Sequence, residues 1–326
     1  MFSYLGKQSC SKPALGPLRK SDNTYTSNDQ EAANCLNEAF SSVFVKDGDA
    51  ITCPAGPTEE YSITSTMTAK LLGQLDINKA VGPDGIPSIF WKECCEQLGV
   101  PLAFIINNSL NSGDIPADFK KACVTPIYKG GSRLDALNYR PISLICVASK
   151  VVERVILNLL QSELDQLGYK DSCQHGFVRK RSCATNLLTA RNDWTKALNN
   201  GDSVDVIFFD FSKALDSVCH DLLVKKLIDI GLSVILTRWI TSYLTGQKQC
   251  VVANASALNG LTLTREFHKE PYMDLFSLFT SDIQKGIISW LLKYADDLNL
   301  YGIIRNILDT QILQQGINLI TDWARK

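Results

Sequence analysis

The chain has 326 residues, of which 45% are hydrophobic and 21% are charged, and its formal net charge is −1 at pH 7. This composition excludes a disordered tail and a fibrous repeat, and it supplies enough apolar surface to bury the core of one large domain or two. A nearly neutral chain is also unlike a protein whose whole surface grips nucleic acid.

Membrane and targeting signals are missing from the sequence pattern. No apolar run approaches the roughly 20 residues that cross a bilayer, so we expect no membrane partner. The first residues carry no basic flank followed by an apolar stretch, which favours a reducing, intracellular compartment. Basic residues outnumber acidic ones between positions 115 and 185, whereas acidic residues prevail over positions 1–60. If a polyanion binds, we expect it to bind through the middle region.

The eleven cysteines form no pattern typical of a metal site or of a disulfide framework. Their number is odd, and no two of them have the Cys-x-x-Cys spacing of zinc sites. We therefore interpret the cysteines of apolar segments, such as Cys123, Cys146 and Cys250, as buried thiols.

The N-terminal third is predicted to be helical with polar connections. Residues 1–65 are linker-like, and apolar spacing predicts one helix over 30–45 within them. A second helix is predicted over 66–75. The Gly- and Pro-rich cluster 81–87 must then be a loop, and helical spacing returns over 88–112.

The middle of the chain is predicted to carry a basic hairpin and two helices. Residues 124–131 read as a strand that ends in a Gly-Gly turn, and residues 139–144 read as a second extended piece. Amphipathic spacing then predicts helices over 150–167 and 185–198.

The C-terminal third is predicted to contain three strands. The β-branched and aromatic run 204–209 is of strand length and ends on Asp210, before a helical segment that continues to about Ile230. Two apolar runs of similar character, 289–294 and 298–301, flank a polar turn and predict a hairpin. Strands mixed with helices in this irregular order favour an α+β fold.

Three carboxylates lie at the ends of these predicted strands. Asp210 ends the first strand, and Asp296 and Asp297 lie at the hairpin tip. A pair of divalent cations that clamps the attacking and leaving oxygens of a phosphoryl transfer needs carboxylates from separate rigid elements. The alternative is a solvated Asp-Asp turn, and for the pair taken alone that alternative is favoured.

The residues around these carboxylates favour the cation site over the solvated turn. FDFSKALD at 209–216, followed by YADD at 294–297, closely resembles the two catalytic boxes of reverse transcriptases from jockey-type retrotransposons without long terminal repeats. Further blocks resemble the same family in the same order, at residues 79–87, 125–131, 138–144 and 174–182.

The resemblance implies an RNA-directed DNA polymerase that transfers a nucleotide from a dNTP to a primer 3′-hydroxyl. It implies an α+β fold with fingers over 66–190 and a palm over 191–326, in which helices back a small antiparallel sheet and the thumb is missing. Two Mg²⁺ ions, an RNA template and a DNA primer are the implied cofactors and partners. A nuclear site of action is inferred from the family alone, and whether a separate partner supplies an endonuclease stays open.

The resemblance also assigns roles to single residues. Asp210 and Asp296 would hold the two Mg²⁺ ions together with the main-chain carbonyl of Phe211. Asp297 would support the site. Lys129 and Arg140 would grip the triphosphate, since an ammonium and a planar guanidinium oppose phosphate charge; without the resemblance, each reads as a solvated surface cation.

Two further binding positions follow from the same blocks. Gln174 and Gly176 belong to the block that would lie along the template strand. Leu215 stands where relatives usually carry an aromatic residue that blocks a ribose 2′-hydroxyl, so we expect weakened exclusion of ribonucleotides.

The sequence departs from the family between the two boxes. The family shows Gly-Val-Pro-Gln-Gly there, whereas this chain has REFHKEPYMD at 265–274. Back-translation in a shifted frame spells Gly-Val-Pro-Gln-Gly-Ala-Leu-His-Gly-Pro, so we hypothesise that compensating frame changes flank Arg265 to Leu275. Codons that cannot be read in this shifted frame would disprove the hypothesis.

The altered loop leaves a second function open, that of a catalytically impaired, nucleic-acid-binding or functionless remnant of such an element. Bulky side chains cannot make the close backbone approach that glycine permits in the family's loop. A two-metal phosphohydrolase is disfavoured, because no histidine lies near either acidic box.

Overall fold

The structure is a computed structural model, and it describes residues 15–42, 61–176, 178, 180–211, 214, 218–253, 256–257, 262–263 and 275–325. The chain divides into two compact units. Unit 1 combines residues 1–44, 60–152 and 242–268, and unit 2 combines residues 45–59, 153–241 and 269–326. None of the described helices is both long enough and apolar enough to cross a bilayer.

Unit 1 is organised around a mixed sheet in the strand order β2-β1-β4-β5, with β6 also paired to β4. β1 and β2 form an antiparallel hairpin, whereas β4 runs parallel to β1. The strands are β1 (Lys121–Tyr128), β2 (Tyr139–Leu144), β4 (Lys248–Ala253), β5 (Ser256–Ala257) and β6 (Thr262–Leu263), with the 3-10 helix η2 (Ala136–Asn138) before β2.

Helix α2 (Asp29–Ser41) covers this sheet. Its buried side chains Leu36 and Phe40 join Val124 of β1 and Val251 of β4 in one apolar cluster. The helix begins at Asn28, whose side chain accepts a hydrogen bond from the Glu31 N–H and so satisfies one of the free donors of the first turn.

The other helices of unit 1 are α3 (Ser65–Gly73), α4 (Ser88–Glu93) and α5 (Cys95–Ser112), and a short 3-10 turn η1 (Ala117–Lys120) leads into β1. α5 packs closely on α3, since a Cβ on Gly99 would lie only 2.8 Å from the Ser65 carbonyl oxygen. The helical spacing predicted over 88–112 is confirmed apart from one break, because the backbone leaves helical geometry at Cys94, with φ −99° and ψ 23°.

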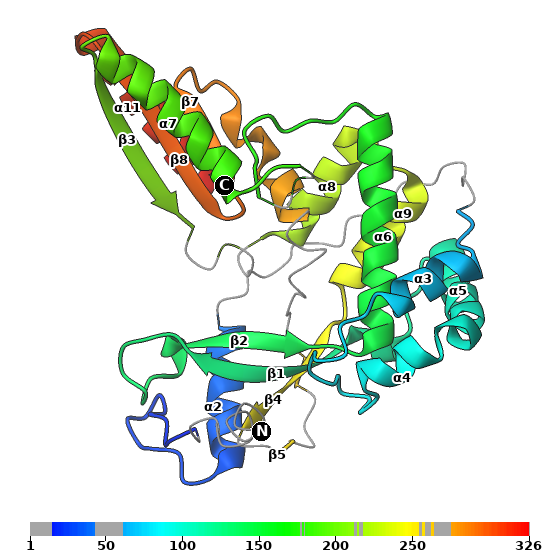
Figure 1. Cartoon of the computed structure of the whole chain (residues 1–326). Helices are drawn as coiled ribbons and strands as arrows, with labels where there is room; N and C mark the ends of the chain where they lie inside the picture. Colours follow the sequence, from blue (N-terminus) through cyan, green and yellow to red (C-terminus); the bar gives the residue numbers. More distant parts are fainter. Residues whose placement is uncertain are drawn as a thin grey trace, which may run out of the picture. The chain divides into compact units, whose positions relative to one another are not determined.

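Unit 2 contains a three-stranded antiparallel sheet in the order β3-β8-β7. The strands are β3 (Ser203–Asp210), β7 (Trp290–Tyr294) and β8 (Asp297–Ile304). Helices α7 (Cys183–Asn199) and α11 (Ile307–Ala324) run alongside this sheet in Figure 1.

The two helices bury opposite faces of the sheet. Ala190 of α7 packs with Leu292 and Tyr301, whereas Leu313 of α11 packs with a second cluster that includes Leu300. Because successive strand residues point to opposite faces, Leu300 and Tyr301 serve different layers. The central strand β8 is therefore buried on both sides.

The remaining helices of unit 2 are α8 (His220–Ile230) and the short 3-10 helix η3 (Ser281–Gln284), which follows a helical turn over 275–279. Helices α6 (Val147–Gln166) and α9 (Val234–Leu244) contain residues of both units. α8 ends at Gly231, which takes the left-handed φ of 92° that glycine adopts without strain.

Helices combined with one mixed sheet and one small antiparallel sheet confirm the α+β prediction. The basic hairpin, the strand that ends on Asp210 and the hairpin over 289–301 were also predicted correctly, as were the helices over 66–75, 150–167 and 185–198. The helix predicted directly after Asp210 begins only at His220 among the described residues. The helix predicted over 30–45 is observed over Asp29–Ser41. Residues 43–45 of the predicted range lie outside the described residues.

Candidate active site

The sheet of unit 2 brings the predicted carboxylates to one end. Asp210, the last residue of β3, is the register partner of Asp297, the first residue of β8. Residues directly opposite each other in an antiparallel pair share a face, and their Cβ atoms typically lie about 5 Å apart. Asp296 precedes Asp297 in the turn between β7 and β8. The ends of two separate strands and the adjoining turn therefore supply three neighbouring acidic side chains.

The charges of these side chains interact. Desolvation raises the pKa of the Asp297 carboxyl, and the negative charges of Asp296 and Asp210 raise it further. Asp210 and Asp297 are exposed to solvent, and Asp296 is half-buried. The site thus concentrates negative charge at an accessible end of the sheet, which favours the binding of a cation.

The donor atoms suit a hard divalent cation, because carboxylate oxygens are the ligands that Mg²⁺ prefers. Within the part of the chain that the structure describes, however, no group of three or more His, Cys, Asp or Glu side chains is arranged to hold a metal ion. Phe211, the predicted main-chain ligand, directs its ring toward Phe276 and Trp323, with ring centroids 6.5 Å and 6.0 Å away. Its ring therefore anchors the end of β3 in the apolar core.

The predicted triphosphate-binding cations lie together on the hairpin of unit 1. Arg140 of β2 is the register partner of Ile127, which lies two residues before Lys129. The Lys129 N–H donates to the Asn138 carbonyl at 2.8 Å, which extends the pairing beyond β1. The strand alternation therefore places Lys129 and Arg140 on one face, as diagonal neighbours roughly 7–8 Å apart, and both are exposed.

The predicted template residues Gln174 and Gly176 are buried against the turn between β7 and β8. Gln174 is fully buried, and its Oε1 accepts hydrogen bonds from the N–H groups of Gly176 at 2.8 Å and Ala295 at 3.1 Å. A Cβ on Gly176 would lie 2.3 Å from the Ala295 nitrogen. Any contact of this block with a template must therefore come from neighbours such as Lys180, which is exposed.

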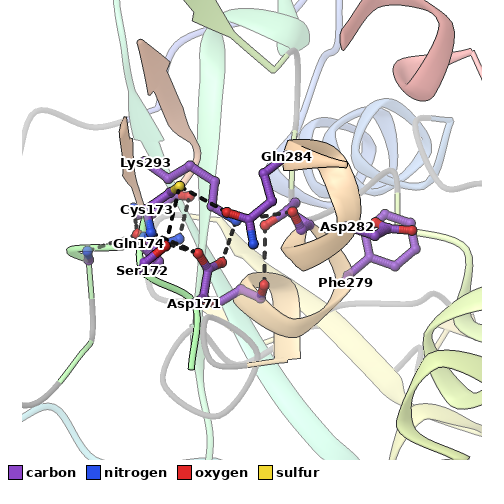
Figure 2. A network of polar contacts seen from close by, with 12 residues as sticks. Asp171, Ser172, Cys173, Gln174, Phe279, Asp282, Gln284 and Lys293 are labelled. Atoms are coloured by element: carbon purple, nitrogen blue, oxygen red, sulfur yellow. Dashed lines mark hydrogen bonds and ion pairs between the residues drawn. The ribbon is translucent and has the colours of Figure 1, made fainter. Parts of the chain in front are cut away.

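A buried ion pair beside this contact was not anticipated from the sequence. The Lys293 ammonium pairs with the Asp171 carboxylate, and the two side chains are only 2% and 6% exposed (Figure 2). The lysine also donates to the Thr280 carbonyl at 3.0 Å. A charged residue in the middle of the apolar run 290–294 was the available signal, because a buried lysine requires a partner.

Two predicted features lie outside the described residues. One is Leu215 in the first acidic box. The other is the altered loop at 265–274.

The sequence is similar to known proteins over most of its length. The family described as reverse transcriptase (RNA-dependent DNA polymerase) matches residues 127–326, a range that includes the hairpin cations and all three carboxylates. The RNA-directed DNA polymerase from mobile element jockey of Drosophila melanogaster is 30% identical over 284 residues, which are 81% of this chain and 30% of the relative.

Two other relatives are also proteins of mobile elements. The protein of the same name from Drosophila funebris is 26% identical over 285 residues, 84% of this chain and 30% of the relative. The retrovirus-related Pol polyprotein from type-1 retrotransposable element R2 of Nasonia vitripennis is 24% identical over 236 residues, 62% of this chain and 21% of the relative. The chain spans about 30% of the length of the two jockey relatives.

Proposed function

The chain belongs to the reverse transcriptase (RNA-dependent DNA polymerase) family, and from that premise we propose that it catalyses RNA-directed DNA synthesis as part of a jockey-type mobile element. The observation that carries the proposal is the pairing of Asp210 with Asp297 beside Asp296. These residues stand in the two blocks that resemble the catalytic boxes of the family. No other acidic cluster in the described residues joins two strand ends in this way.

In the proposed reaction, the primer 3′-hydroxyl attacks the α-phosphate of a dNTP. A P–O bond forms to the primer, and the bond to the leaving pyrophosphate breaks. Asp210 and Asp296, with the Phe211 carbonyl, would hold two Mg²⁺ ions, which when bound supply positive charge at the attacking and leaving oxygens. Asp297 supports the site by adding negative charge beside them.

The cations of the hairpin bind the nucleotide in this proposal. Lys129 and Arg140 share one exposed face, so both can reach the same triphosphate. The guanidinium of Arg140 presents parallel N–H donors to two phosphate oxygens, and Lys129 adds a compact positive charge. Positioning of the triphosphate in this way lowers the entropic cost of bringing the α-phosphate to the primer.

The finer features of the family complete the proposal. Residues 66–190 correspond to fingers and residues 191–326 to a palm. An RNA template, a DNA primer and a dNTP are the proposed partners, and the site of action is intracellular and nuclear. Leu215 relaxes the exclusion of ribonucleotides, and a separate protein is a candidate source of endonuclease activity.

A second function is favoured by the altered sequence over 265–274, which replaces the family's glycine-containing loop. In this alternative the chain binds a primer-template but does not extend it. Phosphate contacts make such binding weaken steeply as salt increases, whereas extension requires the carboxylates as well.

One experiment distinguishes the two functions. Purified protein is given a DNA primer on an RNA template with Mg²⁺ and dNTPs, beside an Asp296→Asn variant and an Asp322→Asn control, whose side chain is exposed on α11. Extension by the unmodified chain and the control, and its loss in Asp296→Asn, supports the polymerase. Salt-sensitive binding without extension by any of the three supports the remnant.

A further inference from the structure

The turn that carries Asp296 has a strained backbone. Ala295 takes the left-handed φ of 58°, one of three non-glycine residues with positive φ in the described chain. This conformation is unfavourable for an L-residue, because its Cβ crowds the following carbonyl oxygen. The pairing of Tyr294 with Asp297 makes Ala295 the first residue of a two-residue hairpin loop, which requires a positive φ there, and contacts to the turn stabilise that form further. The shape of the turn sets where the next residue, Asp296, projects.

Gln174 is the side chain that contacts this turn. Its Oε1 accepts from the Ala295 N–H at 3.1 Å, and its Nε2 donates to the Ala295 carbonyl at 3.5 Å. The amide thus bonds both polar groups of the strained residue. The same Oε1 accepts from the Gly176 N–H at 2.8 Å, so the glutamine also ties the turn to the block that precedes α7.

The main chain around Gln174 is paired to β7 in register. Gln174 forms a parallel bridge with Lys293, in which the His175 N–H donates to the Lys293 carbonyl at 2.9 Å and the Lys293 N–H donates to the Cys173 carbonyl at 2.8 Å. The Asn186 side chain of α7 donates to the same Lys293 carbonyl at 3.1 Å. These bonds fix the position of Gln174 along β7.

Charged side chains hold the segment from both ends. The Asp171 carboxylate pairs with buried Lys293 and also accepts from the N–H groups of Cys173 and Gln174 at 3.1 Å and 3.2 Å. Arg181 donates from one terminal nitrogen to the carbonyls of Asp171, Ser172 and Gln174.

Figure 2 shows the same network reaching the segment at 279–284. The Cys173 thiol donates to Gln284 at 2.9 Å, and Lys293 donates to the Thr280 carbonyl. The segment 171–174, which carries Gln174, is therefore held both to β7 and to residues 280–284.

We propose that Gln174 is a positioning residue, which holds the Ala295 turn in its left-handed form and thereby orients Asp296 for catalysis. The inference deepens the proposed function and rests on it for its catalytic part. It gives Gln174 a role inside the protein, in place of a template contact. Loss of the amide leaves the buried Gly176 N–H and the partly buried Ala295 N–H without their acceptor, and the turn relaxes to a conformation that Ala prefers.

The test compares Gln174→Met with Gln247→Met. Gln247 is also buried, donates from its side-chain amide to a backbone carbonyl, that of Tyr243, at 2.6 Å, and belongs to unit 1. Both variants lose a buried amide of equal size, so both should lower thermal stability to a similar extent. In the extension assay, only Gln174→Met should lower kcat, by about tenfold or more, with KM for the dNTP within about twofold.

Two further measurements test the inference beyond the comparison of the two variants in the extension assay. Hydrogen exchange of the Ala295 amide should become about tenfold faster in Gln174→Met and stay unchanged in Gln247→Met. Adding Ala295→Gly to Gln174→Met should restore part of kcat, because glycine adopts positive φ without strain.

The outcomes separate the two claims. An unmodified chain that fails to extend the primer overturns the proposed function, and exchange at Ala295 then decides the structural inference by itself. Unchanged Ala295 exchange in Gln174→Met overturns the inference. Equal losses of kcat in Gln174→Met and Gln247→Met, without rescue by Ala295→Gly, also overturn it, since they indicate a general effect of destabilisation.

Discussion

Removal of one charge from the buried pair Asp171–Lys293 should strongly destabilise the fold. Asp171→Asn can keep Oδ1, which accepts from Cys173 and Gln174, and replaces Oδ2, the atom that pairs with Lys293, by an uncharged NH2 group. The Lys293 ammonium, 2% exposed, then stays buried without a counter-charge. Breaking a buried pair in this way costs about 3–5 kcal/mol, because the desolvation of the remaining ion is no longer offset.

An exposed pair provides the matched control. Asp322 and Arg325 lie 3.6 Å apart on α11, with side chains 65% and 76% exposed. Asp322→Asn removes the same charge from a solvent-screened pair and should cost no more than about 0.5 kcal/mol. The double variant Asp171→Asn/Lys293→Met removes both buried charges, so it should recover most of the loss seen in Asp171→Asn.

Equilibrium unfolding in urea, followed by circular dichroism and tryptophan fluorescence, measures these differences. A shift of the midpoint with an unchanged slope reports stability alone. The reasoning is refuted if Asp171→Asn costs under about 1 kcal/mol, as an exposed pair does. A double variant less stable than Asp171→Asn would also refute it, because the lysine would then stabilise the fold without its partner.

Three other variants test separate parts of the structure. Gly176→Ala should abolish extension and lower stability by at least about 2 kcal/mol, because its Cβ meets the Ala295 nitrogen at 2.3 Å, whereas Gly16→Ala has open space and should be neutral in urea unfolding. Burial lowers the pKa of His220 to about 4 against the opposing charge of Asp221, so its stabilising contribution is present above pH 6.5 and is lost as pH falls from 6.5 to about 4. That loss is on the order of 3 kcal/mol, and urea unfolding across this range should show it in the unmodified chain but not in His220→Phe. Arg140→Gln should raise KM for the dNTP about tenfold or more in steady-state extension, and an unchanged KM would remove Arg140 from the nucleotide site.

Local patterns in the sequence were sufficient to predict the elements that carry the acidic residues. The run 204–209 is β-branched and aromatic, and the two apolar runs around Asp296 have the length and spacing of a hairpin. Both patterns involve only residues that are close in sequence, so they can be recognised without knowledge of the tertiary structure. The convergence of Asp210 with Asp297 needed the resemblance to the family, because strand order is not encoded locally.

Other features depend on contacts between distant segments and were not predicted. β4 pairs in parallel with β1 across more than a hundred residues. The break at Cys94 interrupts a helical pattern that continues on both sides. The hydrogen bonds between Gln174 and Ala295 join a loop to the turn between β7 and β8. In each case the free energy comes from packing or pairing that the local sequence does not reveal.

The central claim is that Asp210, Asp296 and Asp297 together form a cation site. The most direct test is the binding of Mn²⁺, measured by electron paramagnetic resonance on the purified chain with a dNTP and a primer-template whose primer lacks its 3′-hydroxyl. We expect saturable binding that weakens at least about tenfold in Asp210→Asn and stays unchanged in Asp322→Asn. Equal affinities in the unmodified chain and Asp210→Asn would contradict the assignment of these carboxylates to the active site.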